Sequence, residues 1–493
     1  MRPSTLVSIL TALIAQTSFA ADYYVAPKGD DANPGTLEAP WKTIQKAAST
    51  LQPGDTVFIR KGIYKGLVNI NVSGTAGSPI TFTNFPDEKA VLDAAGIPPP
   101  DEDRALIYIE DRSHLIIRGL ELRNFSTSKA DLQPAGIFIT GASHDIELRN
   151  NNVHGIRNTH RDGSAFGIAA YGNSAAQAIT NLIIDGNEVH HLKTANSESM
   201  VLNGNVKDFE VTNNRVHDNN NIGIDFIGFE DTCPDPALDR ARDGVCRGNV
   251  VWNISSRSNP SYFGDAAADG IYCDGAKNVL IERNLIYLCD IGVELASEHA
   301  NGDTSDCILR DNFISRSRVA GLGLGGYDEL RGKTGNCTVT NNTFYLNDTM
   351  RTGSGEVMLQ FYLTNNTITQ NIFFAGSQNV FVSNGASSNT GTVFDYNCYF
   401  SKGGAEDSEW QWKEADVLGF DQWKSVTMQD AHSLFADPRF VNAAKRDFHL
   451  MPDSPAVNAG DPAYVLPAGE LDIDGQARVT GGRIEIGADE LAP

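Results

Sequence analysis

The sequence is poor in basic residues and, beyond its first twenty positions, in long apolar runs. Only 39 lysines and arginines stand against 62 aspartates and glutamates in 493 residues, which gives a net charge of −23. So little positive charge offers no basic face to nucleic acid or to an anionic membrane. No later apolar run reaches the ~18 residues that a membrane-spanning helix needs. We therefore expect neither nucleic acid among the partners nor insertion into a membrane.

The first twenty residues are predicted to be a secretory signal peptide. They contain Arg2, an apolar stretch from Leu6 to Ala15 and a small-residue ending at Ala20, which is the arrangement of an export signal. The mature protein is therefore expected to be secreted or periplasmic. Its seven cysteines are an odd number, so at least one thiol stays free within a single chain. Cys233 and Cys246 flank an insertion that a disulfide would close.

A sequence motif that contains asparagine repeats along the chain. An alternating apolar segment leads into Asn-x-apolar-aromatic or His, and the asparagine recurs every 26 to 36 residues. These asparagines are Asn151, Asn187, Asn214, Asn249, Asn284, Asn312, Asn342, Asn371 and Asn397. Such a period, with short strands between turn residues, is typical of a solenoid.

A second motif, Gly-apolar-x-apolar-x-Gly, sets the register of the strands. It occurs at 136–141, 167–172, 223–228, 270–275 and 321–326. Because side chains alternate along a strand, its two apolar positions point inward and the residues between them point outward. The pattern resembles the right-handed parallel β-helix of the pectate-lyase-like superfamily over about residues 22–400. That resemblance implies an all-β solenoid of about 10–12 coils, in which the asparagines form a structural ladder.

The rest of the chain is divided around this solenoid. Residues Thr43 to Ser49 are predicted to form a short amphipathic helix that caps the open core. Trp410, Trp412 and Trp423 interrupt the repeat, and we expect them to pack an insertion onto the barrel rather than to stack on sugar rings. The C-terminal residues are similar to a tail module of many secreted bacterial β-helix proteins. The predicted parts are a signal peptide (1–20), an N-terminal cap and first strands (21–102), the β-helix with its active-site face (103–400), the tryptophan-containing insertion (401–430) and the tail module (431–493).

Carboxylates gather on the outward side of three successive coils. Asp225 lies on the first, Asp274 on the second beside Tyr272, and Glu294 on the third, and no lysine or arginine occupies the outward positions of these strands. The same coils carry the longest loops of the repeat region. Long loops over an acidic strip are typical of a cleft. We therefore predict that a polysaccharide or oligosaccharide substrate binds there.

Hydrolysis of a glycosidic bond is the favoured reaction. It needs a protonated carboxyl and a second carboxylate, and Asp274 and Glu294 on adjacent coils should have Cα atoms about 8 Å apart. Asp225 and Tyr272 complete the predicted catalytic set, and this reaction requires no cofactor. Crowded acids raise one another's pKa, which supplies the proton donor. The residues expected to bind substrate are Glu230, Glu298, His299, Tyr327, Arg331, Glu356 and Gln360.

Two alternatives stay open. A calcium-dependent lyase that cuts a uronate-containing glycan by β-elimination would use Tyr272 as base, His299 or Arg331 as the neutralising cation, and Ca²⁺ at Asp225 and Asp269. Residues 268–270 resemble part of the calcium and base region of one pectate lyase family, but the lysine expected after them is missing. The second alternative is a non-catalytic carbohydrate-binding β-helix, which an aromatic strip would favour.

Overall fold

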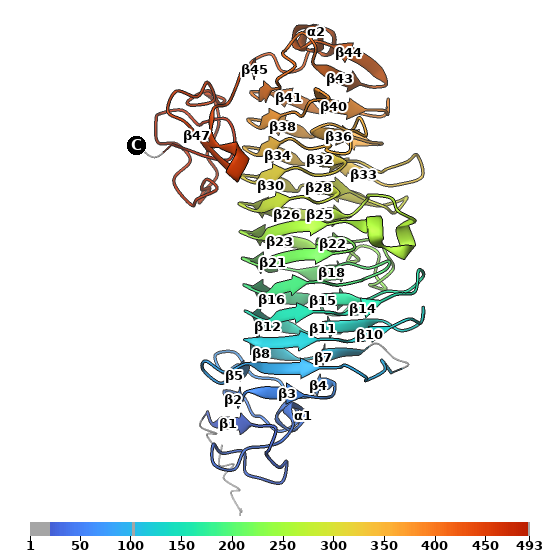
Figure 1. The fold of residues 1–493 in the computed structure, drawn as a ribbon, viewed down its shortest axis with the longest axis vertical. Helices are drawn as coiled ribbons and strands as arrows, with labels where there is room; N and C mark the ends of the chain where they lie inside the picture. The colour runs from blue at the N-terminus through green and yellow to red at the C-terminus, as the bar shows by residue number, and fades with distance from the viewer. Residues whose placement is uncertain (1–19, 101–103, 492–493) are drawn as a thin grey trace, which may run out of the picture.

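The computed structural model describes residues 20–100 and 104–491. Within these ranges the chain is an all-β parallel β-helix, whose short strands stack coil on coil along one long axis (Figure 1). The fold predicted from the two repeated motifs is thus confirmed. The signal peptide, apart from Ala20, lies outside the described residues and stays a prediction. No helix in the described ranges has the length and apolar character needed to cross a bilayer.

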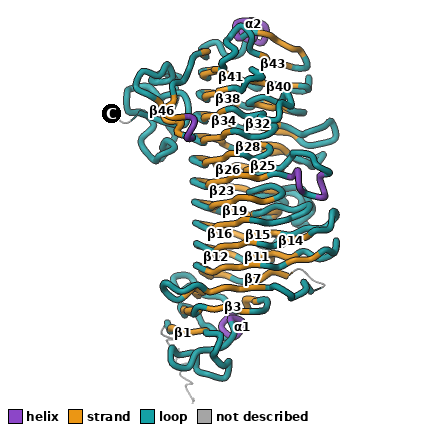
Figure 2. The backbone as a smooth tube through the Cα atoms, viewed as in Figure 1, coloured by secondary structure: helices purple, strands orange, loops and turns teal. Residues whose placement is uncertain are grey.

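Three large sheets form the walls of the β-helix, and their strands lie one above another along its axis (Figure 2). One has 17 strands and begins with β1 (Asp22–Val25), and a second has 13, from β3 (Gly62–Tyr64) to β45 (Leu434–Phe435). The third, which we call the site sheet, contains in order β4 (Val68–Ile70), β7 (Arg104–Glu110), β11 (Pro134–Thr140), β15 (Phe166–Gly172), β18 (Met200–Gly204), β22 (Ile224–Ile227), β25 (Asp269–Asp274), β28 (Ile291–Ala296), β32 (Ala320–Leu324), β36 (Val357–Leu359), β40 (Val380–Asn384), β43 (Glu409–Trp412) and β44 (Ala415–Leu418). Only β43 and β44 pair antiparallel among these described strands, so twelve strands of the site sheet stack in parallel, one from each coil.

Inward side chains of the site sheet stack in register to fill the core. Ile224, Ile271, Val293 and Leu322 follow one another on β22, β25, β28 and β32, and all four are fully buried. Each such side chain stabilises the fold by roughly 1.5–3 kcal/mol through burial. The core therefore fixes which residues of the same strands face outward.

The repeated asparagines form the predicted ladder inside one turn of nine successive coils, from Asn151 to Asn397. The side-chain carbonyl of Asn284 accepts hydrogen bonds from the backbone N–H (2.9 Å) and the side-chain amide (3.0 Å) of Asn249. The Asn249 amide also donates to the carbonyl of Val211, at 2.9 Å. The same pattern links Asn151 through to Asn397. These buried amides satisfy one another and the backbone, so their role is structural.

Short helices lie at both ends of the core. At the start, α1 (Ile44–Ala48) buries Ile44, Ala47 and Ala48, and the Thr43 hydroxyl accepts a hydrogen bond from the backbone N–H of Lys46. At the far end, α2 (Phe420–Thr427) buries Trp423, which stacks on Trp410 at 4.8 Å between ring centroids. Trp410 and Trp423 are both buried. Their faces therefore close the core and are not free to stack on sugar rings.

The last part of the chain lies beside the β-helix (red in Figure 1). It contains the hairpin of β46 (Phe440–Asn442) and β47 (Asp447–Leu450), and Phe448 packs against Phe313 of the β-helix at 5.3 Å. All seven cysteines are buried free thiols. The insertion between Cys233 and Cys246 is therefore not closed by a disulfide in this structure.

Candidate active site

The outward residues of the site sheet stand in the predicted register. Asp225 of β22 lies directly beside Tyr272 of β25, which lies beside Glu294 of β28. Asp274 lies two positions further along β25, next to Ala296. Asp274 and Glu294 are thus diagonal neighbours on adjacent strands, with Cα atoms about 8 Å apart by strand spacing and rise.

Glu294 shares a hydrogen bond with the carboxyl group of Asp269, the first residue of β25. The side-chain amide of Gln360 also donates to Glu294 Oε1, at 2.7 Å. Gly323 stands beside Glu294 on β32, and a Cβ there would lie 3.1 Å from the Glu294 carboxyl. The lack of a side chain at Gly323 therefore leaves room for the carboxyl pair.

Burial and crowding hold protons on this cluster. Burial raises the pKa of Glu294 to about 7. Burial, followed by the Glu294 carboxyl, raises the pKa of Asp269 well above its usual range. The pKa values of Asp225 and Asp274 are also raised well above normal, first by burial and then by neighbouring acids, Glu198 for Asp225 and Glu298 for Asp274. At neutral pH some of these carboxyls are therefore neutral acids.

The loop after β28 brings further predicted residues to Asp274. The backbone N–H of Glu298 donates to Asp274 Oδ1 at 2.7 Å, and His299 Nε2 lies 3.9 Å from Asp274 Oδ2 and 3.8 Å from Glu230 Oε1. The other oxygen of Glu230 accepts a hydrogen bond from the side-chain amide of Asn203, at 2.6 Å. These contacts join the loop residues and the strand acids into one cluster.

Arg331 and Tyr327 reach the same cluster from the next coil. The guanidinium of Arg331 donates to the backbone carbonyl of Glu298 at 3.2 Å, and it lies 4.6 Å from the centroid of the Tyr327 ring. Tyr327 is half exposed, at 50%. The pair therefore forms a cationic and aromatic edge beside an acidic centre.

Glu356 does not belong to this cluster, contrary to the prediction from sequence. It is fully buried, and its carboxylate accepts hydrogen bonds from the backbone N–H (3.0 Å) and the side-chain amide (2.6 Å) of Asn347. It comes just before β36 at the position that Gly321 holds on the previous coil. Residues at that position face the turn and the core, so Glu356 has a structural role.

Glu198 is an acid of the cluster that the sequence reasoning missed. Its carboxyl is buried, and its pKa is raised well above normal, first by this burial and then by Glu230. Counting back along the paired strands β18, β22 and β25 puts Glu198 in the column of Asp269. Aligning the repeats in the sequence would therefore have placed Glu198 in line with Asp269.

The oxygen atoms of the cluster are the donors that a hard cation prefers. Asp225 Oδ1, Asp269 Oδ1 and Asn203 Oδ1 are buried and have no hydrogen-bond partner among the described residues. Ca²⁺ is bound by carboxylate and amide oxygens of this kind. The predicted pair of metal ligands, Asp225 and Asp269, is thus chemically suited to calcium, although a carboxyl that keeps its proton binds metal poorly.

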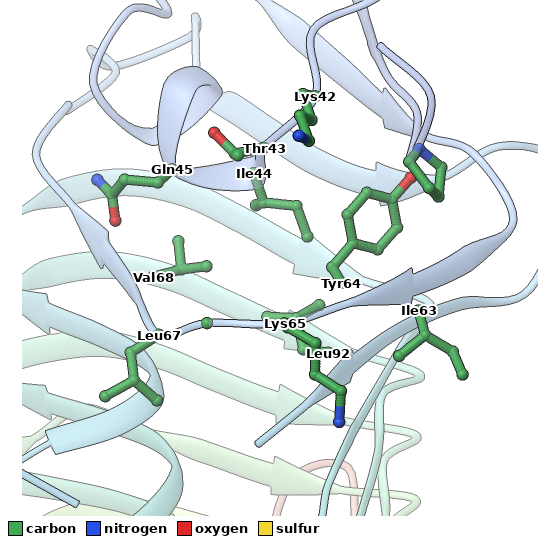
Figure 3. A pocket seen from close by; sticks show the side chains of 12 residues that line it. Lys42, Thr43, Ile44, Gln45, Ile63, Tyr64, Lys65, Leu67, Val68 and Leu92 are labelled. Carbon is green, nitrogen blue, oxygen red and sulfur yellow. The ribbon is translucent and has the colours of Figure 1, made fainter. Parts of the chain in front are cut away.

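A separate hollow lies at the N-terminal cap (Figure 3). Ile44, Tyr64, Val68 and Leu92 line it together with Lys42 and Lys65, and no acid is among its lining residues. Lys65 is paired with Asp93 at 3.0 Å. This hollow therefore has none of the proton-transfer groups of the acidic cluster.

Comparison with known proteins relates the chain to β-helical enzymes. Residues 23–185 match the family described as "Pel9A-like, right handed beta helix region". The chain is 37% identical over 457 residues to the uncharacterized protein YwoF of Bacillus subtilis, covering 92% of this chain and 96% of that one. It is 32% identical over 153 residues to pectate lyase PEL9 of Emericella nidulans, covering 28% and 35% of the two chains. The crystal structure of pectate lyase Pel9A superposes with a TM-score of 0.50 at 17% identity, over 96% of this chain and 97% of that one, which shows a common fold.

Proposed function

Because the chain belongs to the pectate-lyase-like superfamily of right-handed parallel β-helix proteins, in one family with YwoF, we propose that it is a carbohydrate-active enzyme that cleaves glycosidic bonds in a polysaccharide. We propose further that it cleaves them by hydrolysis. The observation that carries this choice is the buried Asp269–Glu294 pair, in which one carboxyl keeps a proton. Such a pair supplies the general acid that hydrolysis needs.

In this mechanism Glu294 protonates the leaving glycosidic oxygen. Its pKa, raised to about 7, leaves a large share of Glu294 protonated at neutral pH, and Asp269 holds the carboxyl in position through their hydrogen bond. Asp274 acts as the second carboxylate, on a water molecule or on the anomeric carbon. The hydrogen bond from the Glu298 backbone N–H favours its ionised form and opposes the burial that raises the pKa of Asp274, so Asp274 acts in this role after it has lost its proton. Glu230, Gln360, Tyr327 and Arg331 are proposed to bind the sugar chain around these acids.

Calcium-dependent β-elimination is the second candidate. The pectate lyase relatives favour it, as do the unpartnered oxygens of Asp225 and Asp269 that suit Ca²⁺. His299 or Arg331 would then neutralise the uronate carboxylate. The base is the weak point, because burial followed by the acid Asp274 raises the pKa of Tyr272 well above its usual range. A phenol in that environment gives up its proton with difficulty.

One experiment separates the two reactions. The purified protein is incubated with a panel of acidic and neutral polysaccharides, with and without a chelator, and followed by reducing-end assay and ultraviolet absorbance. We expect new reducing ends without absorbance, lost in Asp274→Asn and Glu294→Gln and kept in Glu210→Gln, an exposed acid on another sheet. Chelator-sensitive absorbance that survives Glu294→Gln would establish the lyase. Retention on a polysaccharide gel without any product would establish a binding protein.

A further inference from the structure

Two histidines and an aspartate converge on the 17-stranded sheet, apart from the acidic cluster. His114 lies in β8 (Ser113–Arg118), and His144 begins β12 (His144–Arg149) on the next coil. Since His144 is paired with Ser113, Asp145 stands directly beside His114. His114 and Asp145 both have left-handed backbone conformations, with φ of 54° and 52°. The two residues therefore lie at equivalent bends of two successive coils.

The ligand atoms of these three residues face one another. Asp145 Oδ2 lies 2.6 Å from His144 Nδ1 and 3.7 Å from His114 Nδ1, and one ligand atom from each residue fits within a 4.8 Å span. In a tetrahedral zinc site with bonds of about 2.0–2.1 Å, neighbouring ligand atoms are about 3.3 Å apart. Small side-chain rotations bring all three atoms to that separation. The three side chains are 21–36% exposed, so an ion can reach them.

Neighbouring groups complete the environment that a metal site needs. The side-chain amide of Asn181, in β16 (Ile179–Asp185), donates to Asp145 Oδ1 at 3.0 Å and leaves Oδ2 directed at the histidines. A supporting hydrogen bond of this kind orients the ligating carboxylate. A hollow lined by Thr75, Pro79, His114, Asp145, Glu147 and Asn181 lies beside the three residues. It leaves space for water as a fourth ligand.

We propose that His114, His144 and Asp145 bind one divalent transition metal ion, with Zn²⁺ as the best fit. Two imidazoles and one carboxylate are the donor types that Zn²⁺ takes, and three protein ligands leave one open position. The other His–Asp group, around His449, is explained without a metal. Both ring nitrogens of His449 are engaged by carboxylates, Nδ1 by Asp447 at 2.6 Å and Nε2 by Asp474 at 2.9 Å. Among the described residues, Asp145 is the only carboxylate within 4 Å of a His114 ring nitrogen, and at 3.7 Å it is beyond hydrogen-bonding distance.

The test is a titration of the EDTA-treated full-length protein with Zn²⁺ by calorimetry, and with Co²⁺ by visible absorption. We expect one equivalent of Zn²⁺ to bind, and Co²⁺ to give the intense visible bands of four-coordination. His114→Asn and His144→Asn should each weaken Zn²⁺ binding at least about tenfold, and Asn181→Ala about 10–100-fold, as for other supporting residues.

His432→Asn is the matched control. His432 hydrogen-bonds with Asp395 at 2.7 Å through a similar His–Asp contact, but it belongs to neither of the His–carboxylate groups able to hold a metal in the described residues. The affinity of the His432→Asn variant for Zn²⁺ should equal that of the unaltered protein. Unchanged binding in both His114→Asn and His144→Asn would overturn the proposal, as would the absence of Zn²⁺ binding by the unaltered protein. Loss in Asp269→Asn alone would also overturn it, because the ion would then sit in the acidic cluster. Circular dichroism and the metal-free Tm verify that each variant is folded.

Discussion

Asp269 and Glu294 hydrogen-bond to each other through their carboxyl groups, across the adjacent strands β25 and β28. Two carboxyls can do so only while one of them keeps a proton. Gln360 also donates to Glu294 Oε1, so the Glu294 carboxyl is held by two neighbours. The two groups therefore titrate as a unit.

The first prediction concerns this pair. Glu294→Gln should lower kcat/KM by about 10²–10⁴-fold, because an amide cannot pass a proton to the leaving oxygen. Folding should be retained, since glutamine has nearly the same shape and can donate to Asp269. Initial rates on the polysaccharide identified by the panel measure the effect, with Glu210→Gln as the control of unchanged rate. Full activity in Glu294→Gln would remove Glu294 from the mechanism.

The second prediction concerns the pH dependence of stability. The folded-state pKa of Glu294 is raised to about 7 from 4.5, so the folded protein binds the proton more tightly than the unfolded chain does. This contribution to stability is complete below about pH 4.5 and is lost as the pH rises through 7. Asp225, Asp269 and Asp274 are shifted in the same direction.

Urea unfolding between pH 5 and 8 checks this prediction. The midpoint should fall as the pH rises, and the slope should be shallower in Glu294→Gln than in Glu210→Gln. Paired surface acids do not obscure the effect. The pKa of Glu88 is lowered to about 2, first by its hydrogen bond with Arg60, so its contribution is lost only in stronger acid. His190, whose pKa is lowered to about 4 chiefly by burial, adds stability as the pH rises toward 6.5, so equal slopes in Glu294→Gln and Glu210→Gln would contradict the proton-holding cluster.

The third prediction concerns the asparagine ladder. Asn249→Ala should destabilise the protein by about 2–4 kcal/mol, because it leaves buried groups on Val211 and Asn214 without partners. Asn69→Ala is the control, since Asn69 is an exposed residue of β4 outside the ladder and its backbone is not left-handed. Its effect should stay below about 0.5 kcal/mol. Urea unfolding measures both, and equal effects would remove the special role of the ladder.

The sequence predicted the parts of this structure that repeat. Two motifs recur in successive coils, and stacked parallel strands place their equivalent positions side by side. The asparagine ladder and the register of Asp225, Tyr272 and Glu294 follow from this repetition. One position of each repeat was enough to align its neighbours. The outward acids could therefore be assigned to one face before the structure was known.

The parts that depart from alternation were not predictable. A Cβ on Gly270 would face Ile286 and Cys289 in the core, and Ile271 also packs there, so two successive residues point inward. This irregularity brings Asp269, rather than Asp274, into hydrogen-bonding contact with Glu294. Glu356 was wrongly predicted to face outward because it is a hydrophilic residue beside a strand. In the structure it faces a turn. Side-chain partners of this kind are decided by local backbone geometry that apolar patterning does not encode.

The last prediction concerns how the C-terminal part is held against the β-helix. Arg478 and Asp311 are both fully buried and form an ion pair, with Nε and Oδ1 3.4 Å apart, and Arg478 also donates to the carbonyl of Gly487 at 2.9 Å. Arg478→Met removes the charge and leaves Asp311 in the interior with Arg310, at 3.7 Å, as the remaining cation within 4 Å among the described residues. Breaking a buried pair from one side costs about 3–5 kcal/mol.

The expected result of Arg478→Met is release of residues beyond about 440 to limited proteolysis, while the β-helix and its activity persist. The control is Arg439→Met, which breaks an ion pair with Asp453 whose side chains are 50% and 65% exposed. Exposed pairs of this kind contribute about 0–1 kcal/mol, so proteolysis there should be unchanged. If Arg478→Met and Arg439→Met are cleaved at the same rate, apolar contacts such as Phe448 against Phe313 hold the C-terminal part, and the ion pair serves only to neutralise Asp311.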